Sequence, residues 1–195
     1  MADYNPNYDL ASVTAMVSEL EPYLLSKELY WPLTARSPVP SLSLPRLTLG
    51  GLFLALARLR AVETTLSSSA LGALRRAQVD LETVRSKWAA AIDRKIQQEL
   101  KSRLDLWQGL LSDCREQPQR CADNFAQEVQ IRVMTTLLFD QASPMAETRA
   151  PEDRLSQLDG AFRSMFAPGP FVWPEALQPS FPRDQFWYLY GRPKA

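Results

Sequence analysis

The sequence of 195 residues contains no histidine. Imidazole is the usual ligand of zinc and of haem and non-haem iron, and it is the usual base of acyl-transfer triads. The Glu-x-x-His repeats of di-iron helical bundles are also impossible without it. Histidine-based catalysis is therefore excluded, and we expect no catalytic triad, no bound metal and no other cofactor.

A surplus of charge of one sign is also missing, because 22 basic and 22 acidic residues leave a net charge of zero. A neutral chain has no overall field that would steer it toward nucleic acid or an anionic membrane. The longest uncharged apolar stretch, 47–57, is well short of the roughly 20 residues with which a helix crosses a bilayer. We therefore expect neither a nucleic-acid partner nor a membrane partner.

Cysteine is scarce, with two residues in the chain, and this is consistent with a reducing compartment. The N-terminal residues, Met-Ala-Asp-Tyr-Asn-Pro, include no basic or apolar segment, so they do not predict a secretory signal. The hydrophobic share of 46% and the charged share of 23% are close to the averages of globular proteins. These features predict a soluble, cytoplasmic protein with a single domain over 1–195.

Helical patterns follow one another along the chain, and no strand pattern persists. Apolar residues recur at spacings of three and four, which is typical of helices with one buried face. Asp9 is the predicted N-cap of the first helix, and Pro22 is predicted to restart or kink this helix. We predict an all-α antiparallel bundle of about five helices, over residues 9–25, 48–65, 70–113, 121–141 and 151–167, with an irregular proline-rich loop at 30–45.

The segment 70–113 is the longest predicted helix and the predicted centre of the bundle. Its apolar stripe runs from Leu74 to Leu111 in ten steps over 37 residues, a mean of 3.7 residues per step. A left-handed coiled coil requires about 3.5, so the mean period predicts a nearly straight, unbroken helix lying along the bundle. The helix at 121–141 is about half as long, which motivates the hypothesis that a second copy covers the remaining length in a homodimer.

The C-terminal segment, 168–195, changes character and is rich in proline and aromatic residues. Aromatic side chains beside a few polar groups are typical of ligand pockets and protein interfaces. The same residues also suit an irregular strap that buries its rings over a helical bundle, and we favour the strap. The candidate ligand- or partner-binding residues are Trp31, Phe171, Trp173, Phe186, Trp187 and Tyr190.

Cys114 and Cys121 flank the predicted turn between two helices. The facing ends of a helical hairpin can bring two Cα atoms within the roughly 4.4–6.8 Å that a disulfide needs. Free structural thiols are the favoured interpretation, and a disulfide is the alternative. A metal site or a nucleophilic thiol is disfavoured, because no histidine is present to complete or activate it.

The chain contains no glycine-rich phosphate loop and no nucleophile elbow. Long helices present surfaces and catalytic constellations are missing, so we expect a non-enzymatic protein-interaction or scaffolding domain with a protein partner. The alternative is a small-molecule or peptide binder that uses the aromatic C-terminal segment as a lid. An enzyme that relies on carboxylate, lysine, tyrosine or arginine chemistry is the least favoured class.

Overall fold

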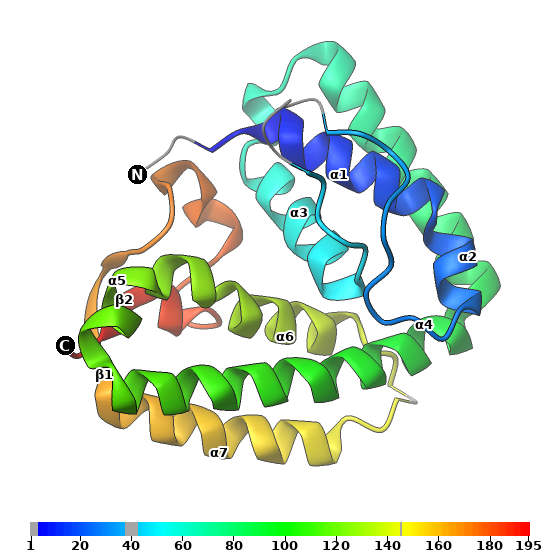
Figure 1. The fold of residues 1–195 in the computed structure, drawn as a ribbon. Helices are drawn as coiled ribbons and strands as arrows, with labels where there is room; N and C mark the ends of the chain where they lie inside the picture. Colours follow the sequence, from blue (N-terminus) through cyan, green and yellow to red (C-terminus); the bar gives the residue numbers. More distant parts are fainter. Residues whose placement is uncertain (1–3, 38–42, 145) are drawn as a thin grey trace. The chain divides into compact units, whose positions relative to one another are not determined.

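The computed structural model describes residues 4–37, 43–144 and 146–195, so Pro38 and Pro40 of the predicted loop lie outside the described residues. The predicted mainly α-helical fold, built on one long helix, is confirmed (Figure 1). Within the described residues, no helix is both long enough and apolar enough to cross a membrane. The chain forms two compact units, Met1–Glu99 and Leu100–Ala195, which we call the N-terminal unit and the C-terminal unit.

The N-terminal unit is built from short helices and the first part of a long one. Its elements are α1 (Pro6–Ser18), α2 (Leu20–Leu25), α3 (Leu49–Ala61), the 3-10 helix η1 (Glu63–Thr65) and α4 (Ser68–Glu116), which continues into the C-terminal unit. Helix α1 packs against α3, and the Glu21 carboxylate of α2 forms a 2.8 Å ion pair with Lys87 of α4. An isolated antiparallel bridge between Trp31 and Leu47 holds the loop between α2 and α3.

Helix α1 begins earlier than the sequence pattern predicted. Its N-cap is Asn5 and not Asp9: the Asn5 side chain accepts a hydrogen bond from the N–H of Asn7, and Pro6 lies in the first turn. Proline is favoured there because the N–H that it lacks has no helical partner. Asp9 is instead buried and accepts a 2.9 Å hydrogen bond from the Tyr4 hydroxyl. This burial raises the pKa of Asp9.

The N-terminus of α3 is closed by two side chains. The Thr48 hydroxyl accepts a 3.0 Å hydrogen bond from the N–H of Gly51, as an N-cap does. Glu99 of α4 is fully buried, and both of its carboxylate oxygens lie 3.1 Å from the backbone nitrogen of Gly50. The first N–H groups of a helix lack internal partners and carry partial positive charge, so a buried carboxylate is stabilising there. Glu99 thereby ties α3 to α4.

Helix α4 is longer than predicted, but the expectation of an unbroken, nearly straight rod is wrong. The backbone of Trp88 has φ −123° and ψ 29°, which is not helical, so two helical stretches meet at this residue. Kinks usually occur at proline or glycine, yet neither residue lies near this break. The Trp88 side chain is half-buried, and the Lys87 ammonium lies 5.3 Å from its ring centroid.

The mean period of the apolar stripe conceals this break. From Leu74 to Trp88 the stripe advances 14 residues in four steps, or 3.5 per step, and from Trp88 to Leu104 it advances 16 residues in four steps, or 4.0. An ideal helix has about 3.6 residues per turn, so one straight helix cannot keep both stretches on the same side. A break at Trp88 allows each stretch to bury its own stripe.

The C-terminal unit combines the last part of α4 with three helices and a small sheet. Its further elements are α5 (Pro118–Glu128), α6 (Gln130–Gln141), α7 (Arg149–Met165), β1 (Phe166–Phe171), the 3-10 helices η2 (Glu175–Ser180) and η3 (Trp187–Leu189), and β2 (Tyr190–Pro193). The predicted helix at 121–141 is divided at Val129, which has ψ −13° and accepts a hydrogen bond from the N–H of Arg132 in a tight turn.

Two strands in the C-terminal segment correct the expectation that the chain contains none. Strands β1 and β2 form an antiparallel pair in which Phe166 lies opposite Pro193. Gly191 has φ 149°, and a Cβ at this position would collide with the Ala167 carbonyl, so glycine is required there. The β1 sequence, Phe-Ala-Pro-Gly-Pro-Phe, lacks the alternating β-branched residues that predict a strand, and its prolines cannot donate to a ladder.

We expect the Glu99→Gln substitution to lower the free energy of unfolding by about 1–3 kcal/mol, because it removes the charge from a buried acceptor at a helix N-terminus. Glu82→Gln is the matched control, because Glu82 is exposed on the same helix; it should change this free energy by less than about 0.5 kcal/mol. Urea unfolding followed by circular dichroism measures both effects. Equal effects of the two substitutions would contradict the capping role of Glu99.

Candidate functional site

The predicted aromatic residues of the C-terminal segment lie in one cluster of packed rings. The ring centroid of Phe171 lies 6.4 Å from that of Trp173 and 5.2 Å from that of Tyr190. Phe181 links Trp173 to Phe186, with both centroids 5.1 Å from its own. Edge-to-face and tilted ring pairs at these distances are typical of a well-packed aromatic core.

The other two predicted residues, Trp187 and Trp31, belong to different units. Trp187 extends the ring cluster, since its centroid lies 5.6 Å from that of Tyr188. Trp31 belongs to the N-terminal unit, where its indole N–H donates a 2.8 Å hydrogen bond to the Glu19 carboxylate. The same carboxylate accepts hydrogen bonds from the N–H and the hydroxyl of Thr34. These contacts give Trp31 a local role in fixing its own loop.

Most rings of the C-terminal strap (168–195) are buried, whereas Phe171 and Trp187 are half-buried. Trp173 is 5% exposed and Phe186 is 2% exposed. The indole N–H of Trp173 donates to the Ala126 carbonyl at 2.6 Å, and the Tyr190 hydroxyl donates to the Phe181 carbonyl at 2.8 Å. A lid over a ligand needs rings that face open space, whereas these rings pack against one another. Their packing supports the structural interpretation of the strap.

A buried polar network joins the strap to α6 and α7. Arg132 donates to both oxygens of Asp159, with a closest distance of 2.7 Å, and also donates to the Thr136 hydroxyl. The Thr136 hydroxyl lies 2.7 Å from that of Tyr188. Burial alone would lower the pKa of Arg132, but Tyr188 and Asp159 raise it overall, and burial raises the pKa of Tyr188 to about 12. Groups with such values suit a structural network better than proton transfer near neutral pH.

Lys95 is a buried lysine in the N-terminal unit, and burial lowers its pKa. A lysine of this kind is a candidate for nucleophilic or base chemistry. Its ammonium, however, donates to the backbone carbonyl of Glu28 and lies 4.3 Å from the ring centroid of Tyr23. These contacts give Lys95 a structural role. Among the residues that the structure describes, no group of three or more Cys, Asp or Glu side chains could hold a metal ion.

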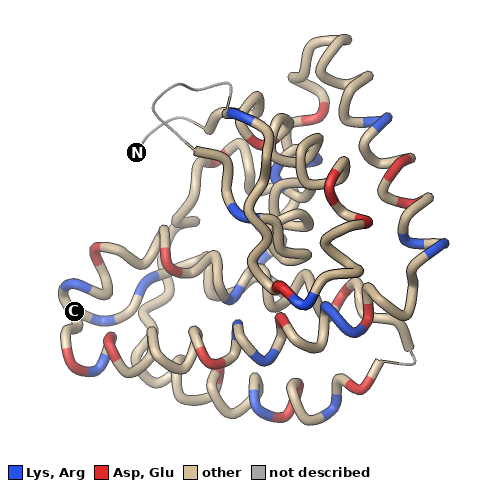
Figure 2. The backbone as a smooth tube through the Cα atoms, turned by 45° about the vertical axis from the view of Figure 1, so that its right-hand side comes forward, with Lys and Arg blue, Asp and Glu red and all other residues tan. Residues whose placement is uncertain are grey.

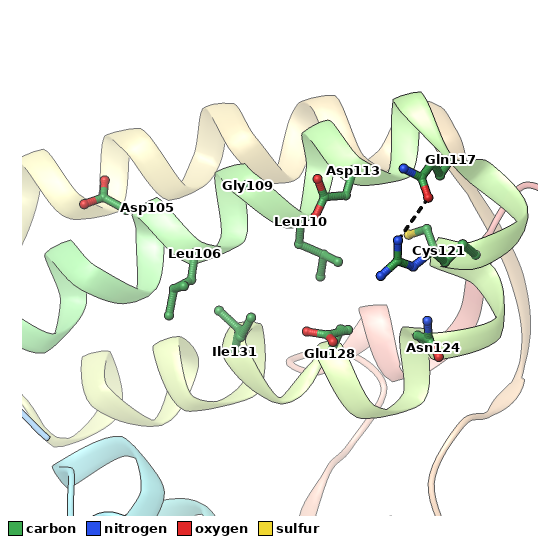
Figure 3. Close-up of a pocket in the computed structure, with 11 residues that line it drawn as sticks. Asp105, Leu106, Gly109, Leu110, Asp113, Gln117, Cys121, Asn124, Glu128 and Ile131 are labelled. Atoms are coloured by element: carbon green, nitrogen blue, oxygen red, sulfur yellow. Dashed lines mark hydrogen bonds between the residues drawn. The ribbon is translucent and has the colours of Figure 1, made fainter.

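A groove of about 380 Å³ lies between α4 and helices α5 and α6 in the C-terminal unit (Figure 3). Leu106 and Leu110 of α4 point across it toward Ile131 of α6. Leu106 is 44% exposed, and eight of the eleven lining residues are exposed, so the groove is open to solvent. The lining residues are Asp105, Leu106, Gly109, Leu110, Asp113, Gln117, Arg120, Cys121, Asn124, Glu128 and Ile131.

Acidic side chains surround the apolar floor of the groove. Three carboxylates, from Asp105, Asp113 and Glu128, and one guanidinium, from Arg120, give the lining a net charge of −2 (+1 − 3). The Asp105 carboxylate is paired with Arg154 at 2.8 Å. Within the described part of the chain, no side chain forms an ion pair or hydrogen bond with the carboxylates of Asp113 and Glu128. Two negative charges at the groove are therefore available to an occupant.

Gly109 leaves a gap in the α4 wall of the groove. It lies inside a helix, where glycine costs about 0.5–1 kcal/mol relative to alanine. A Cβ at this position would meet no other atom within 4 Å, so packing within the chain does not require glycine. The missing side chain instead widens the groove beside Leu110.

A disulfide between Cys114 and Cys121 lies at one end of the groove, which Cys121 helps to line. The Cα atoms are 4.9 Å apart, so the two cysteines are bonded, and the favoured interpretation of free thiols is wrong. Only Gln117 separates α4 from α5, and the bond therefore staples a tight helical hairpin. It fixes the separation of the two groove walls at this end.

Sequence reasoning missed the groove because each residue that lines it is unremarkable by itself. The charged residues of α4 are typical of a solvated helix face. Two signals were nevertheless present in the sequence. Gly109 interrupts a long helix without a capping position nearby, and Leu106 falls outside the buried stripe formed by Leu104, Trp107 and Leu111. Together, these two residues could have indicated an open surface on this side of the helix.

Loss of the disulfide should lower the free energy of unfolding by about 2–3 kcal/mol, because a short closed loop restricts the unfolded chain. Urea unfolding of the native chain with and without reductant measures this difference. The Cys114→Ala/Cys121→Ala double variant should unfold at the lower midpoint in both conditions. A native chain whose midpoint does not change with reductant would rule out a stabilising bond.

No protein-family model, no curated protein and no solved structure matches the chain.

Proposed function

We propose that the chain is a non-enzymatic protein-interaction domain that binds a segment of a partner in the groove of the C-terminal unit. The exposed Leu106 carries this proposal: it lies beside the buried Leu110 and opposite the half-buried Ile131, with open space between the helices. Covering apolar surface is favourable by about 25 cal/mol per Å². Helix-in-groove recognition uses floors of this kind.

The other functional classes have less support. A small-molecule or peptide binder with the strap as its lid needs space beneath Trp173 and Phe186, and both rings are buried in ring contacts. An enzyme without histidine needs a polar group that is free to react. The buried cations of Arg132 and Lys95 are engaged by Asp159 and by the Glu28 carbonyl. A binding surface on the helices is the function that the geometry supports best.

The proposal includes no nucleic-acid partner, because basic and acidic residues are both spread over the described backbone (Figure 2). A homodimer remains a hypothesis, but the length of α4, which motivated it, supports it less than expected. Segments of the same chain cover both parts of α4: α3 contacts Glu99 in the N-terminal unit, and Phe162 of α7 contacts Trp107 in the C-terminal unit. A second copy is not required to cover the length of this helix.

A photo-crosslinking amino acid at position 106 should capture a partner protein in cells that express the chain. Position 79 is the matched control, because Val79 is 66% exposed on the same helix but lies outside the groove. Mass spectrometry of the digested product identifies the partner peptide that is joined to each position. We expect a defined peptide from position 106 and none in common with position 79.

The groove itself is tested with two substitutions at open helical glycines. Gly109→Leu fills the groove and should reduce capture from position 106 to background. Gly160→Leu should leave it unchanged, because a Cβ at Gly160 also meets no atom within 4 Å and this residue does not line the groove. Capture that is indifferent to Gly109→Leu would show that the groove is not the binding site.

The proposed cytoplasmic location conflicts with a persistent disulfide, because disulfides are rare in reducing compartments. Alkylation of intact cells, followed by mass spectrometry of the peptides that contain Cys114 and Cys121, distinguishes a reduced pair in the cytoplasm from a persistent disulfide. If the location is cytoplasmic, both thiols should be alkylated. A bonded, unmodified pair would place the chain in an oxidising compartment.

A further inference from the structure

We infer that the segment bound in the groove is a cationic amphipathic helix of a partner protein, with lysine or arginine residues flanking one apolar stripe. The inference rests on the proposed function and specifies the chemistry of the partner. The spacing of the apolar residues, the charge of the rim and the gap at Gly109 support it independently.

The apolar floor has the spacing of a helix surface. Leu106 and Leu110 are four residues apart on α4, which corresponds to roughly 6 Å along the axis. Residues i and i+4 of a partner helix have the same spacing, so its apolar side chains can pack between these leucines and Ile131. The α4 wall from Asp105 to Asp113 extends roughly 12 Å, which matches about two helical turns.

The rim selects the charge of this helix. Asp113 belongs to α4 and Glu128 to α5, so the two available carboxylates come from the two walls that bound the floor. Basic residues on both sides of an apolar stripe would pair with them. An acidic helix would instead bring like charges against the carboxylates of Asp113 and Glu128. Rim charges of this kind increase the association rate and make binding sensitive to salt.

Gly109 allows a partner helix to approach α4 closely. The distance between packed helix axes, roughly 8–10 Å, depends on the side chains at the contact. Glycine in the α4 wall removes one side chain where the partner helix would cross. The unfavourable helix propensity of Gly109, which nothing within the free chain explains, is then offset in the complex.

Occupants of other chemistry satisfy only part of the site. A small organic cation could pair with Asp113 and Glu128 but would leave much of the Leu106 side chain in water. A neutral apolar peptide could cover Leu106 but would bring its uncharged surface against two carboxylates. A cationic amphipathic helix satisfies both the floor and the rim.

The test uses the full chain and three synthetic fluorescent peptides of about 16 residues, a length of roughly 24 Å as a helix. The first is an amphipathic helix of leucine and lysine. The second replaces its lysines with glutamate, and the third replaces its leucines with serine while keeping the charge. Fluorescence anisotropy at low and at moderate salt measures each Kd. We expect the leucine–lysine peptide to bind and the other two peptides not to bind, and we expect its affinity to be weaker at higher salt.

Two variants locate this binding. Asp113→Asn/Glu128→Gln should raise the Kd of the leucine–lysine helix about tenfold, which corresponds to about 1.4 kcal/mol. Gly109→Leu should raise it at least as much, whereas Gly160→Leu should leave it unchanged. Asp113 and Glu128 are exposed, so the double variant should remain folded, and circular dichroism with thermal unfolding verifies this.

Equal binding of the glutamate or the serine peptide would overturn the inference, as would leucine–lysine binding that neither groove variant weakens. Failure of the proposed function gives a different result, because position 106 would then capture no partner. A captured partner whose crosslinked segment is acidic or uncharged would leave the proposed function standing and overturn only the cationic helix.

Discussion

The packing of Phe162 is the interaction on which the C-terminal unit depends. This fully buried residue of α7 makes ring contacts, at centroid distances between 5.0 and 5.8 Å, with Trp107, Phe125, Phe166 and Trp187. One side chain thus joins α7 to α4, α5, β1 and η3. Trp107 must face Phe162, and Gly109 lies roughly 200° further around α4 at about 100° per residue. Leu106 lies roughly 100° and Leu110 roughly 60° from Trp107 on the same scale, so the groove begins at the edge of this core and extends onto the exposed side of α4.

Local patterns in the sequence predict the helices but not how they are divided. The helix class and the long central element follow from periodicity and propensity. The first helical segment is divided at Glu19, before the predicted position at Pro22, which lies inside α2. The break at Trp88 escaped prediction because two different periods average to nearly 3.6. The strand pair escaped because Gly191 and Pro168, which lies opposite it, are typical of loops, and only their pairing makes these segments strands. Averages over many residues conceal changes of direction that a fold requires.

The aromatic strap shows why residue type alone does not decide between a core and an interface. Trp173 and Tyr190 carry the large apolar area and the polar tip that both environments favour. Their hydrogen bonds to the carbonyls of Ala126 and Phe181 satisfy those polar tips within the chain. Such long-range partners, which no local pattern reveals, make the strap part of the core. The groove is the reverse case, since its residues resemble an ordinary solvated face until two helices bring them together.

Two residues of the groove, Leu106 and Gly109, do not stabilise the free chain, and a disulfide holds the groove walls in place. An exposed Leu106 and a helical Gly109 each forgo a small amount of stability, which matters in a fold whose total stability is typically about 5–15 kcal/mol. The disulfide between Cys114 and Cys121 holds the adjoining walls together at one end. A site with fixed walls loses little conformational entropy when it binds, so more of the contact energy appears as affinity. Preorganisation of this kind is expected of a docking surface, and burial within the chain alone would not require it.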